Sequence, residues 1–571
     1  MAHQAGKLSA VEGTKAESRG LRGTVAAELA AADGRGGVSE GTYNLLKFHG
    51  TYEQFDRDTA TELKQRGEDK DWQFMVRVRA PGGRLTAAQW LALDALADRY
   101  SDGTLRITTR QALQFHGVRR GNLKANIAAI NAMLLTTFAA CGDVVRNIVT
   151  TPAPRRDAIH ARLEADARML STALLPRTRS YWEIFTDEAP GEDSGKEAEP
   201  LYGDAYLPRK FKIGIAHPAD NTIDVLTNDL GLIAVFAGDR LQGYQVCVGG
   251  GLGMTHNRPD TYPRLATPVA FVGPDDLLRV AEAVIRLQRD HGDRGDRKRA
   301  RLKYVLDDKG LPWLREALAG YYGAPLPAPR EDLPPLTVPE LLGWHPQGDG
   351  RCWMGVPVPS GRVADRAGVA LRSAIRELVE RYGSDPVLTP QQDLLLSNLP
   401  ADSRATVEAI LRGHGVRLAE DLSPLSRWAL ACPALPTCGL ALTEAERVRQ
   451  PIVEAIEAVL ERHGLRGERI SLRITGCPNG CARPYAGDIG LVGRVPGQFA
   501  IFVGGDFEGT RLSFKLQERV PQARIAAVLE PLFAAFAARR LGGEGFGDFC
   551  HRLGAEALHA VAQQPAAVAA E

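Results

Sequence analysis

The chain has 571 residues, several times the roughly 150 of a typical domain, so it should contain more than one hydrophobic core. Hydrophobic residues make up 44% and charged residues 24%, which excludes a largely disordered, collagen-like or coiled-coil chain. The 70 Lys and Arg residues almost balance the 69 Asp and Glu residues, which disfavours a nucleic-acid partner. Any site for anions must therefore be built locally.

No part of the sequence reaches the roughly 20 apolar residues that span a bilayer. The best candidate, residues 525–537, is interrupted by Glu530 and Pro531. Residues 1–20 lack the apolar core of a secretory signal, so we expect a cytoplasmic protein with no membrane partner. Eight cysteines are too few for a disulfide scaffold, and clustered thiols in a reducing compartment indicate metal binding or catalysis.

Two parts of the sequence repeat each other in the same order. Residues 74–84 (FMVRVRAPGGR) resemble residues 353–362 (WMGVPVPSGR), about 280 positions later. Residues 106–111 (RITTRQ) resemble residues 387–392 (VLTPQQ) at nearly the same displacement. We infer an internal duplication, and hence a pseudo-twofold molecule whose interface can hold a large ligand.

Local patterns predict a mixed α/β architecture in both repeats. Thr86 and Gln89 form a capping box ahead of apolar residues at helical spacing, which predicts a helix over residues 86–101. Its counterpart is expected at residues 368–382. Strands are expected on either side of these helices, at residues 74–79, 113–118, 356–359 and 393–398.

Four of the eight cysteines form two pairs near the carboxyl end. Cys432 and Cys438 enclose five residues, and Cys477 and Cys481 enclose three. Four thiolates in two pairs fit an iron–sulfur cluster or a structural zinc ion, but five enclosed residues are wide for zinc. Merely buried thiols would not predict paired spacing on Pro- and Gly-containing turns. Core packing is expected for the remaining thiols, those of Cys141, Cys247, Cys352 and Cys550.

With these cysteines, the sequence resembles the sulfite and nitrite reductases that couple a sirohaem to a [4Fe-4S] cluster. Within that family it is most similar to the hemoprotein (β) subunits of assimilatory NADPH-dependent sulfite reductases. Each matching fragment is weak, but their order along the chain is specific. The fragments are residues 21–24, 48–50, 106–111, 115–117, 146–147, 206–212, 303–304 and 543–548, besides the cysteine pairs.

The resemblance implies six-electron reduction of sulfite to sulfide in assimilatory sulfur metabolism. It implies that all four paired cysteines ligate the cluster and that Cys481 is also the axial ligand of the sirohaem iron. The substrate is a small oxyanion, so its site should be a group of fixed cations. The resemblance assigns this catalytic role to Arg110, Arg146, Lys210 and Lys212. We expect the lysines to donate protons, because burial beside cations lowers a Lys pKa towards neutrality.

Sirohaem carries eight carboxylates, so the rest of its binding site should also be rich in donors. By position, the resemblance points to seven residues: Arg106, Gln111, Gln114, His116, Lys303, Asn479 and Arg483. For several of them, strand-edge bonding, core packing or an ordinary ion pair is an equal alternative. One departure from the family is evident: Val149, Thr150 and Thr151 follow Arg146 and Asn147, where a cysteine is usual.

The resemblance implies an internally duplicated α/β (α+β) molecule. Two ferredoxin-like half-modules and two sirohaem- and cluster-binding modules are expected, at residues 71–140 and 336–415, and at 141–335 and 416–571. Residues 1–70 would be an N-terminal arm for partner docking, and its first 40 residues should order only against a partner or the opposite half. Linkers are expected in the acidic segment 188–199 and in the Pro-rich segment 323–339.

The sequence has no Gly-x-Gly-x-x-Gly fingerprint or phosphate-binding loop, so we do not expect this chain to bind NADPH. Electrons should come from another protein, a flavoprotein subunit or a ferredoxin. Within the enzyme class the alternative is a sirohaem nitrite reductase, although the PALPT run inside the first cysteine pair is typical of sulfite reductases. The alternative from another class is a non-catalytic zinc or iron–sulfur scaffold protein.

Overall fold

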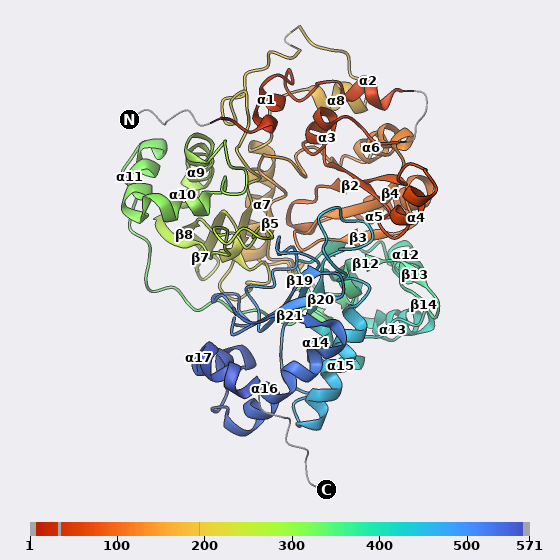
Figure 1. Ribbon diagram of the computed structural model, residues 1–571, viewed down its shortest axis with the longest axis vertical. Helices are drawn as coiled ribbons and strands as arrows, with labels where there is room; N and C mark the ends of the chain where they lie inside the picture. The colour runs from red at the N-terminus through yellow and green to blue at the C-terminus, as the bar shows by residue number, and fades with distance from the viewer. Residues whose placement is uncertain (1–6, 32–35, 193, 563–571) are drawn as a thin grey trace.

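The computed structural model describes residues 7–31, 36–192 and 194–562. Figure 1 shows the N-terminal part of the chain, red to green, in the upper part of the molecule and the C-terminal part, teal to blue, in the lower part. Each part contains one antiparallel sheet and one mixed sheet. The elements recur in the same order, which confirms the duplicated α/β fold that the repeats predicted.

The first ferredoxin-like half is an antiparallel sheet with two helices. Its sheet has the order β1-β2-β4-β3-β12, in which β1 is Thr51–Phe55 and β12, from the second repeat, is Arg362–Val363. Its elements are β2 (Trp72–Val78), α5 (Ala87–Tyr100), β3 (Leu105–Ile107), β4 (Leu113–Val118) and α6 (Leu123–Ala132). The predicted capping box is confirmed, because Thr86 Oγ1 accepts from the main chain of Gln89 at 3.2 Å and the Gln89 side chain accepts from Thr86 N at 3.0 Å.

The second half repeats this arrangement with the sheet order β10-β11-β16-β15. Its elements are β10 (Gly343–Pro346), β11 (Arg351–Val356), α12 (Leu371–Tyr382), β15 (Pro386–Leu388), β16 (Leu394–Pro400) and α13 (Arg404–Gly413). The strand predicted at residues 356–359 is wrong. Strand β11 ends at Val356, and Pro359, which lacks a main-chain donor, opens a 3-10 turn in which Ser360 has a φ of 58°.

The two halves exchange short strands. β12 (Arg362–Val363) belongs to the second repeat but pairs with β3 of the first, with Arg362 opposite Arg106. In return, Arg84 of the first repeat forms a bridge with Val387 in β15. This reciprocal pairing places the two ferredoxin-like sheets around one pseudo-twofold axis.

Each half also contains a five-stranded mixed sheet. The first is β5 (Val149–Thr150), β6 (Ile213–Ala216), β7 (Leu230–Ala237), β8 (Arg240–Val248) and β9 (Thr267–Val272). The second is β17 (Ala429–Ala431), β18 (Leu472–Thr475), β19 (Ile489–Val495), β20 (Gln498–Val503) and β21 (Phe514–Pro521). In both sheets the first two strand pairs are parallel and the last two antiparallel. The two sheets are therefore copies of one another.

Helices pack on these sheets, and Figure 1 shows α9, α10 and α11 beside β7 and β8. The helices of the first copy are α7 (Ala158–Ala173), α8 (Ser180–Phe185), α9 (Leu277–His291), α10 (Leu302–Lys309) and α11 (Leu311–Tyr322). Those of the second are α14 (Pro424–Arg427), α15 (Arg449–Arg462), α16 (Ile525–Arg539) and α17 (Phe546–Ala562). A small hairpin consists of β13 (Asp365–Arg366) and β14 (Val369–Ala370). Short 3-10 helices lie at Pro81–Gly83, Arg120–Asn122, Val225–Thr227, Pro274–Asp276, Pro359–Gly361, Ala401–Ser403, Ala419–Asp421 and Gln522–Arg524.

The N-terminal segment packs on the first half of its own chain. Its elements are α1 (Ala10–Ala16), α2 (Val25–Leu29), α3 (Glu40–Leu46), β1 (Thr51–Phe55) and α4 (Ala60–Gln65). Strand β1 pairs with β2, and the amine of Lys15 donates to the Leu207 carbonyl at 2.7 Å. For the described residues among the first 40, such as Lys15, the prediction that they order only against a partner or the opposite half is therefore wrong. A role in docking stays a prediction.

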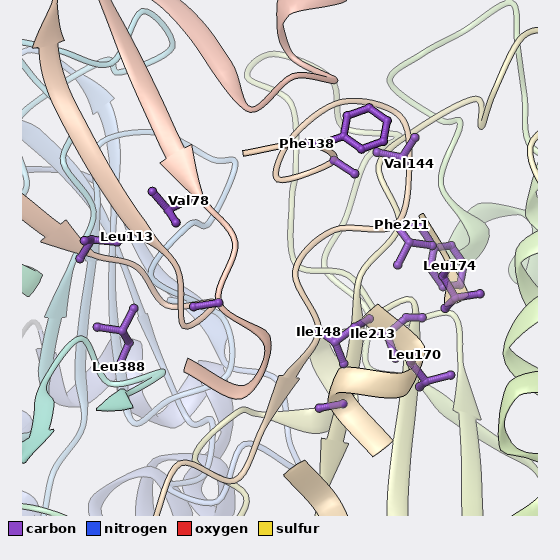
Figure 2. Close-up of a cluster of buried hydrophobic side chains, with 14 of the residues drawn as sticks. Val78, Leu113, Phe138, Val144, Ile148, Leu170, Leu174, Phe211, Ile213 and Leu388 are labelled. Carbon is purple, nitrogen blue, oxygen red and sulfur yellow. The ribbon is translucent and has the colours of Figure 1, made fainter. Parts of the chain in front are cut away.

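One hydrophobic core runs through both ferredoxin-like sheets and the first mixed sheet. Figure 2 shows Val78 and Leu113 of the first ferredoxin-like sheet on the same side as Leu388 of the second repeat. Ile148 and Ile213, beside the first mixed sheet, lie on the other side. A separate core lies under the second mixed sheet. The two ferredoxin-like halves and the first mixed sheet therefore share one continuous core.

Candidate functional site

The two cysteine pairs lie at one edge of the second mixed sheet. Cys432 directly follows β17 and Cys477 lies two residues beyond the end of β18. These strands are parallel neighbours, so their carboxyl ends meet at the same edge. The main-chain amide of Gly476 also donates to the sulfur of Cys432 at 3.3 Å. The fold therefore brings together the pairs that are far apart in the sequence.

The four thiols interact electrostatically. Burial and the charge of Cys481 raise the pKa of Cys477 to about 12. Burial is likewise the first cause, and Cys481 the second, of the raised pKa values of Cys432 and Cys438. Such thiols are protonated at neutral pH unless a bound metal holds them as thiolates. The cysteine edge is thus suited to bind metal rather than to act as free thiolates.

The four thiols do not converge on one point in this structure. Within residues 7–31, 36–192 and 194–562, no three His, Cys, Asp or Glu side chains converge closely enough to hold one metal ion. A multi-iron cluster spreads its thiolate ligands further apart than one ion does. The main-chain and side-chain amides of Asn479 also hydrogen bond to Cys477 and favour its thiolate form. Asn479 therefore lies at the thiols, where it was predicted to contact a cofactor.

The predicted substrate cations come together at the edge of the first mixed sheet. Lys210 and Lys212 flank Phe211, whose main chain bridges to Val145 beside β5. The main-chain amide of Arg146 donates to the Phe211 carbonyl at 2.9 Å. This pairing places Arg146 and the two lysines on adjacent chain segments.

Arg110 reaches the same edge from the loop between β3 and β4. Its guanidinium donates to the carbonyls of Asn147 at 2.7 Å and Ile213 at 3.0 Å. Its Nε has no hydrogen-bond partner although it is buried. The neighbouring Thr109 hydroxyl donates to the carbonyl of Cys481 at 3.0 Å. The cations of the first half and the cysteines of the second therefore face one seam.

The cations at this seam lack enough anions to balance them. Burial first, then the charges of Arg209 and Arg146, lower the pKa of Lys210 to about 7, while Cys481 raises it. Burial first, then neighbouring cations, lower the pKa of Lys212 well below its usual value, while Asp229 raises it. Among the described residues, none accepts a hydrogen bond from either lysine amine. Such a site favours an anionic ligand.

The sequence analysis missed two candidate functional residues, Arg77 and Cys141. Arg77, on β2, donates to the sulfur of Cys141 at 2.7 Å, and Arg146 approaches the same sulfur at 3.5 Å. Cys141 is buried as expected, but it faces two arginines rather than only apolar neighbours. With its amide oxygen turned towards Arg77, Gln114 accepts from that guanidinium at 2.6 Å. The alternation of side chains along the predicted strand at residues 74–79 could have identified Arg77, since it places Arg77 on one defined face of that strand.

Three of the predicted sirohaem contacts have protein partners of their own. Arg106 pairs with Glu446 at 3.2 Å and donates to a main-chain carbonyl beside Cys432. The Lys303 amine donates to three main-chain carbonyls of the segment 251–262. Arg483 donates to two carbonyls and approaches Asp224 at 3.1 Å. These side chains position the loops of the site, and their contact with a cofactor stays a prediction.

Gln111 has a structural partner in the second repeat. Its amide donates to the Gly82 carbonyl at 3.0 Å and accepts from the main chain of Thr150 at 2.9 Å. At the matching position, Gln392 donates to the Ser360 carbonyl and accepts from the main chain of Ala431. Both glutamines tie a 3-10 turn to the first strand of a mixed sheet. The sirohaem contact of Gln111 stays a prediction.

His116 differs from these residues. It is 1% exposed, and neither ring nitrogen has a hydrogen-bond partner. Burial first, then Arg362 and Arg106, lower its pKa well below the usual value, so the ring is neutral. Buried polar atoms without partners are uncommon and call for an explanation such as an unseen ligand.

Thr150, where a cysteine was expected, instead bonds through its hydroxyl to the Ile215 carbonyl at 2.9 Å.

None of the helices within the described ranges is long and apolar enough to cross a membrane.

The chain matches two family models in duplicate. The model described as "Nitrite and sulphite reductase 4Fe-4S domain" matches residues 141–326 and 426–569. The model described as "Nitrite/Sulfite reductase ferredoxin-like half domain" matches residues 65–133 and 345–414. Each model therefore matches once in either repeat, as a duplicated chain requires.

Proteins named "Sulfite reductase [NADPH] hemoprotein beta-component" are similar over nearly the whole chain. The Myxococcus xanthus protein is 45% identical over 99% of this chain and 100% of its own length. The protein of Xanthomonas oryzae pv. oryzae (strain PXO99A) is 46% identical over 96% of this chain and 97% of its own. The fold matches that of the Mycobacterium tuberculosis NirA protein, with a TM-score of 0.77, 24% identity and 95% of both chains covered. The chain belongs to the nitrite and sulfite reductase family, whose domains carry a [4Fe-4S] cluster.

Proposed function

We propose that this chain is the hemoprotein component of a sulfite reductase and catalyses the six-electron reduction of sulfite to sulfide. The observation that carries the proposal is the seam at which unbalanced cations of the first half, Lys210 and Lys212, face the cysteine edge of the second. The hemoprotein names of relatives about 45% identical over the full length support the same reaction.

The residues present fit the two cofactors. Cys432, Cys438, Cys477 and Cys481 would hold the [4Fe-4S] cluster, and Cys481, the exposed one of the four, would also reach the sirohaem iron. The unpartnered nitrogens of His116 and the unbalanced cations suit a macrocycle with many carboxylates. When bound, the two cofactors store and deliver electrons and give the sulfur of sulfite a metal to bind.

The chain's own side chains would bind the anion and supply its protons. Reduction of sulfite consumes six electrons and seven protons and releases three waters, so proton delivery is a central task. Arg110 stays protonated near neutrality even though burial lowers its pKa to about 9, which suits binding. Lys210, with its pKa lowered to about 7, can give up a proton at neutral pH and take another from solvent. We assign binding chiefly to Arg110 and Arg146, and proton donation to Lys210 and Lys212.

The proposed electron donor is an NADPH-linked flavoprotein, as the names of the relatives suggest, with a ferredoxin as the alternative. The first cysteine loop comes to the surface at Leu440, which is 68% exposed two residues after Cys438. Arg57 fixes this loop by donating to the carbonyls of Cys438 at 3.3 Å and Ala441 at 2.7 Å. A donor that docks over Leu440 would deliver electrons next to Cys438, one of the proposed cluster ligands.

Replacing Leu440 with glutamate should therefore weaken the protein donor. We expect its apparent KM to rise by about tenfold, the contribution of one hot-spot contact, while reduction by a small viologen dye is unchanged. Leu541→Glu is the matched control, because Leu541 is 58% exposed outside the cysteine loops. Equal loss with the dye and with the protein donor would rule out docking at Leu440.

Anaerobic assays test the function directly. The protein loaded with both cofactors should convert sulfite to sulfide with reduced flavoprotein, and sulfite should be preferred to nitrite. More efficient nitrite reduction would favour the nitrite reductase alternative. A colourless protein that contains zinc and no iron would instead indicate the scaffold alternative.

A further inference from the structure

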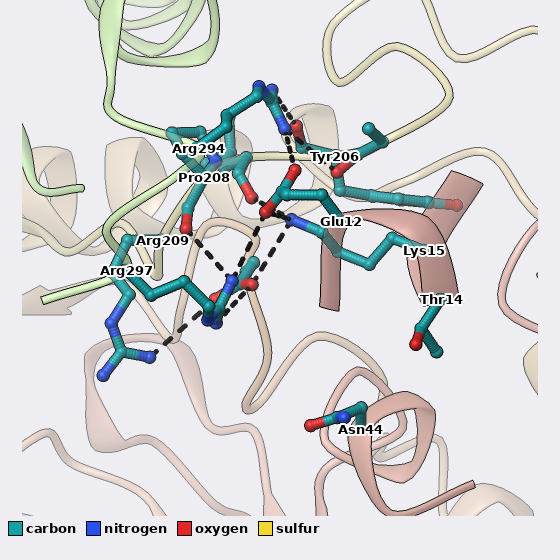
Figure 3. Close-up of polar contacts among 12 residues, drawn as sticks. Glu12, Thr14, Lys15, Asn44, Tyr206, Pro208, Arg209, Arg294 and Arg297 are labelled. Carbon is teal, nitrogen blue, oxygen red and sulfur yellow. Dashed lines mark hydrogen bonds and ion pairs between the residues drawn. The ribbon is translucent and has the colours of Figure 1, made fainter. Parts of the chain in front are cut away.

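A cluster of buried and half-buried charges joins helix α1 to the main chain that leads into Lys210 (Figure 3). We call it the α1 charge cluster. Its carboxylates, Glu12 and Asp143, are 2% and 5% exposed. Its cations are Lys15, Arg209, Arg294 and Arg297. The proposed reaction uses none of these side chains.

The two carboxylates hold the cations in place. Glu12 pairs with Lys15 at 2.7 Å, with Arg297 at 3.4 Å and also with Arg294. Asp143 pairs with Arg297 at 2.8 Å, with Lys15 at 3.4 Å and with Arg209 at 4.0 Å. Burial raises the pKa of Asp143, but these three cations lower it by more, so the carboxylate is ionised.

The same cations bind four consecutive main-chain carbonyls. Arg294 donates to Ala205 at 3.4 Å and to Tyr206 at 2.7 Å. Lys15 donates to the next carbonyl, that of Leu207, at 2.7 Å, and Arg297 donates to that of Pro208 at 3.3 Å. The Leu207 amide in turn donates to the Asp143 carbonyl at 3.0 Å. Every residue from 205 to 208 is thus held by the cluster, immediately before Arg209 and Lys210.

We propose that Glu12 and Asp143 are positioning residues for the substrate lysines. By fixing the cations on residues 205–208, they fix the direction in which the chain enters the segment that carries Lys210 and Lys212, directly before β6. Removal of Glu12 would take from Arg294 its carboxylate partner in the cluster, and removal of Asp143 would do the same to Arg209. Lys15 and Arg297 would each keep only one of their two carboxylates, so the cluster should loosen locally. The cations would then turn to solvent and release the carbonyls. This inference rests on the proposed function only for the role of the two lysines.

The test compares Glu12→Gln and Asp143→Asn with Asp94→Asn in the full-length protein loaded with its cofactors. Asp94 is a matched control, because it is 1% exposed and pairs with Arg372 at 2.5 Å between α5 and α12. Hydrogen exchange at residues 205–212 is the main measurement, and it requires no activity. We expect faster exchange there in the first two variants and unchanged exchange in Asp94→Asn.

Glu12→Gln and Asp143→Asn should also lower kcat/KM for sulfite by about 10- to 100-fold, the cost of a small misplacement of reacting groups. Asp143→Glu, which keeps the charge, should recover most of that loss. If Asp143→Asn does not fold, Glu12→Gln alone decides, because Glu12 lies on the N-terminal helix α1, far in the sequence from Arg146 and the two lysines. Equal exchange at residues 205–212 in Glu12→Gln, Asp94→Asn and the unmodified protein would overturn the proposal. Failure of the unmodified protein to reduce sulfite would contradict the proposed function and leave the exchange result standing.

Discussion

Replacing Cys481 with serine should abolish sulfite reduction and remove most of the visible absorption of the protein. Cys481 is the one exposed thiol of the four, and its charge acts on the other three. A serine hydroxyl remains protonated where a thiol ionises on metal, so it cannot replace a thiolate ligand. Because this sulfur is proposed to serve both cofactors, its loss should affect both.

Iron content, the visible spectrum and the rate of sulfide formation are the measurements for this variant. We expect less iron than in the unmodified protein and activity at the assay background. Cys352→Ser is the control, since Cys352 is a half-buried thiol on β11, outside the cysteine pairs. Full iron content with full activity in Cys481→Ser would exclude the shared-ligand assignment.

The second large effect is expected from the substrate lysines. Replacing Lys212 with methionine should lower kcat by on the order of 100- to 10,000-fold, the usual contribution of a positioned general acid. Sulfite affinity should change less, because Arg110 and Arg146 remain. Lys124→Met is the control, since the side chain of Lys124 is 47% exposed and pairs with Asp187. A change confined to affinity would reverse the division between binding and proton donation.

The pH dependence should report on Lys210. Its pKa is about 7, lowered by burial first and then by Arg209 and Arg146, so the protonated donor predominates below pH 7 and is lost above it. The rate of sulfite reduction should therefore fall as the pH rises through about 7. In Lys210→Arg the charge persists but the proton is held too strongly to transfer. That variant should turn over slowly, with no fall near pH 7. The same fall in Lys210→Arg would assign the titration to another group.

Local chemistry accounts for what the sequence predicted. Thr86 and Gln89 define the start of α5 within four residues, and the cysteine spacing fixes two turns without knowledge of the fold. In each case the determining residues are neighbours in the sequence.

Long-range contacts decide the features that the sequence did not predict. The two-residue strand β12 forms only because β3 of the other repeat offers it an edge. Cys141 looks like any core thiol until Arg77 and Arg146 are placed beside it. Likewise, the composition around Lys303 does not reveal that three carbonyls already occupy its amine. A buried cation with protein partners and one that awaits a ligand have the same sequence signature.

The copied mixed sheets have unequal ends. At the positions directly after β5 and two residues after β6, the first copy carries Thr151 and Pro218 where the second carries Cys432 and Cys477. In the described sheets, only the edge of the second mixed sheet therefore carries cysteines that can bind an iron–sulfur cluster. In the proposed reaction, the six electrons of a turnover must then enter one after another through the one cluster at this edge. The equivalent edge of the first mixed sheet binds no cluster in this proposal. It can therefore serve to hold the anion while the donor protein binds and dissociates several times.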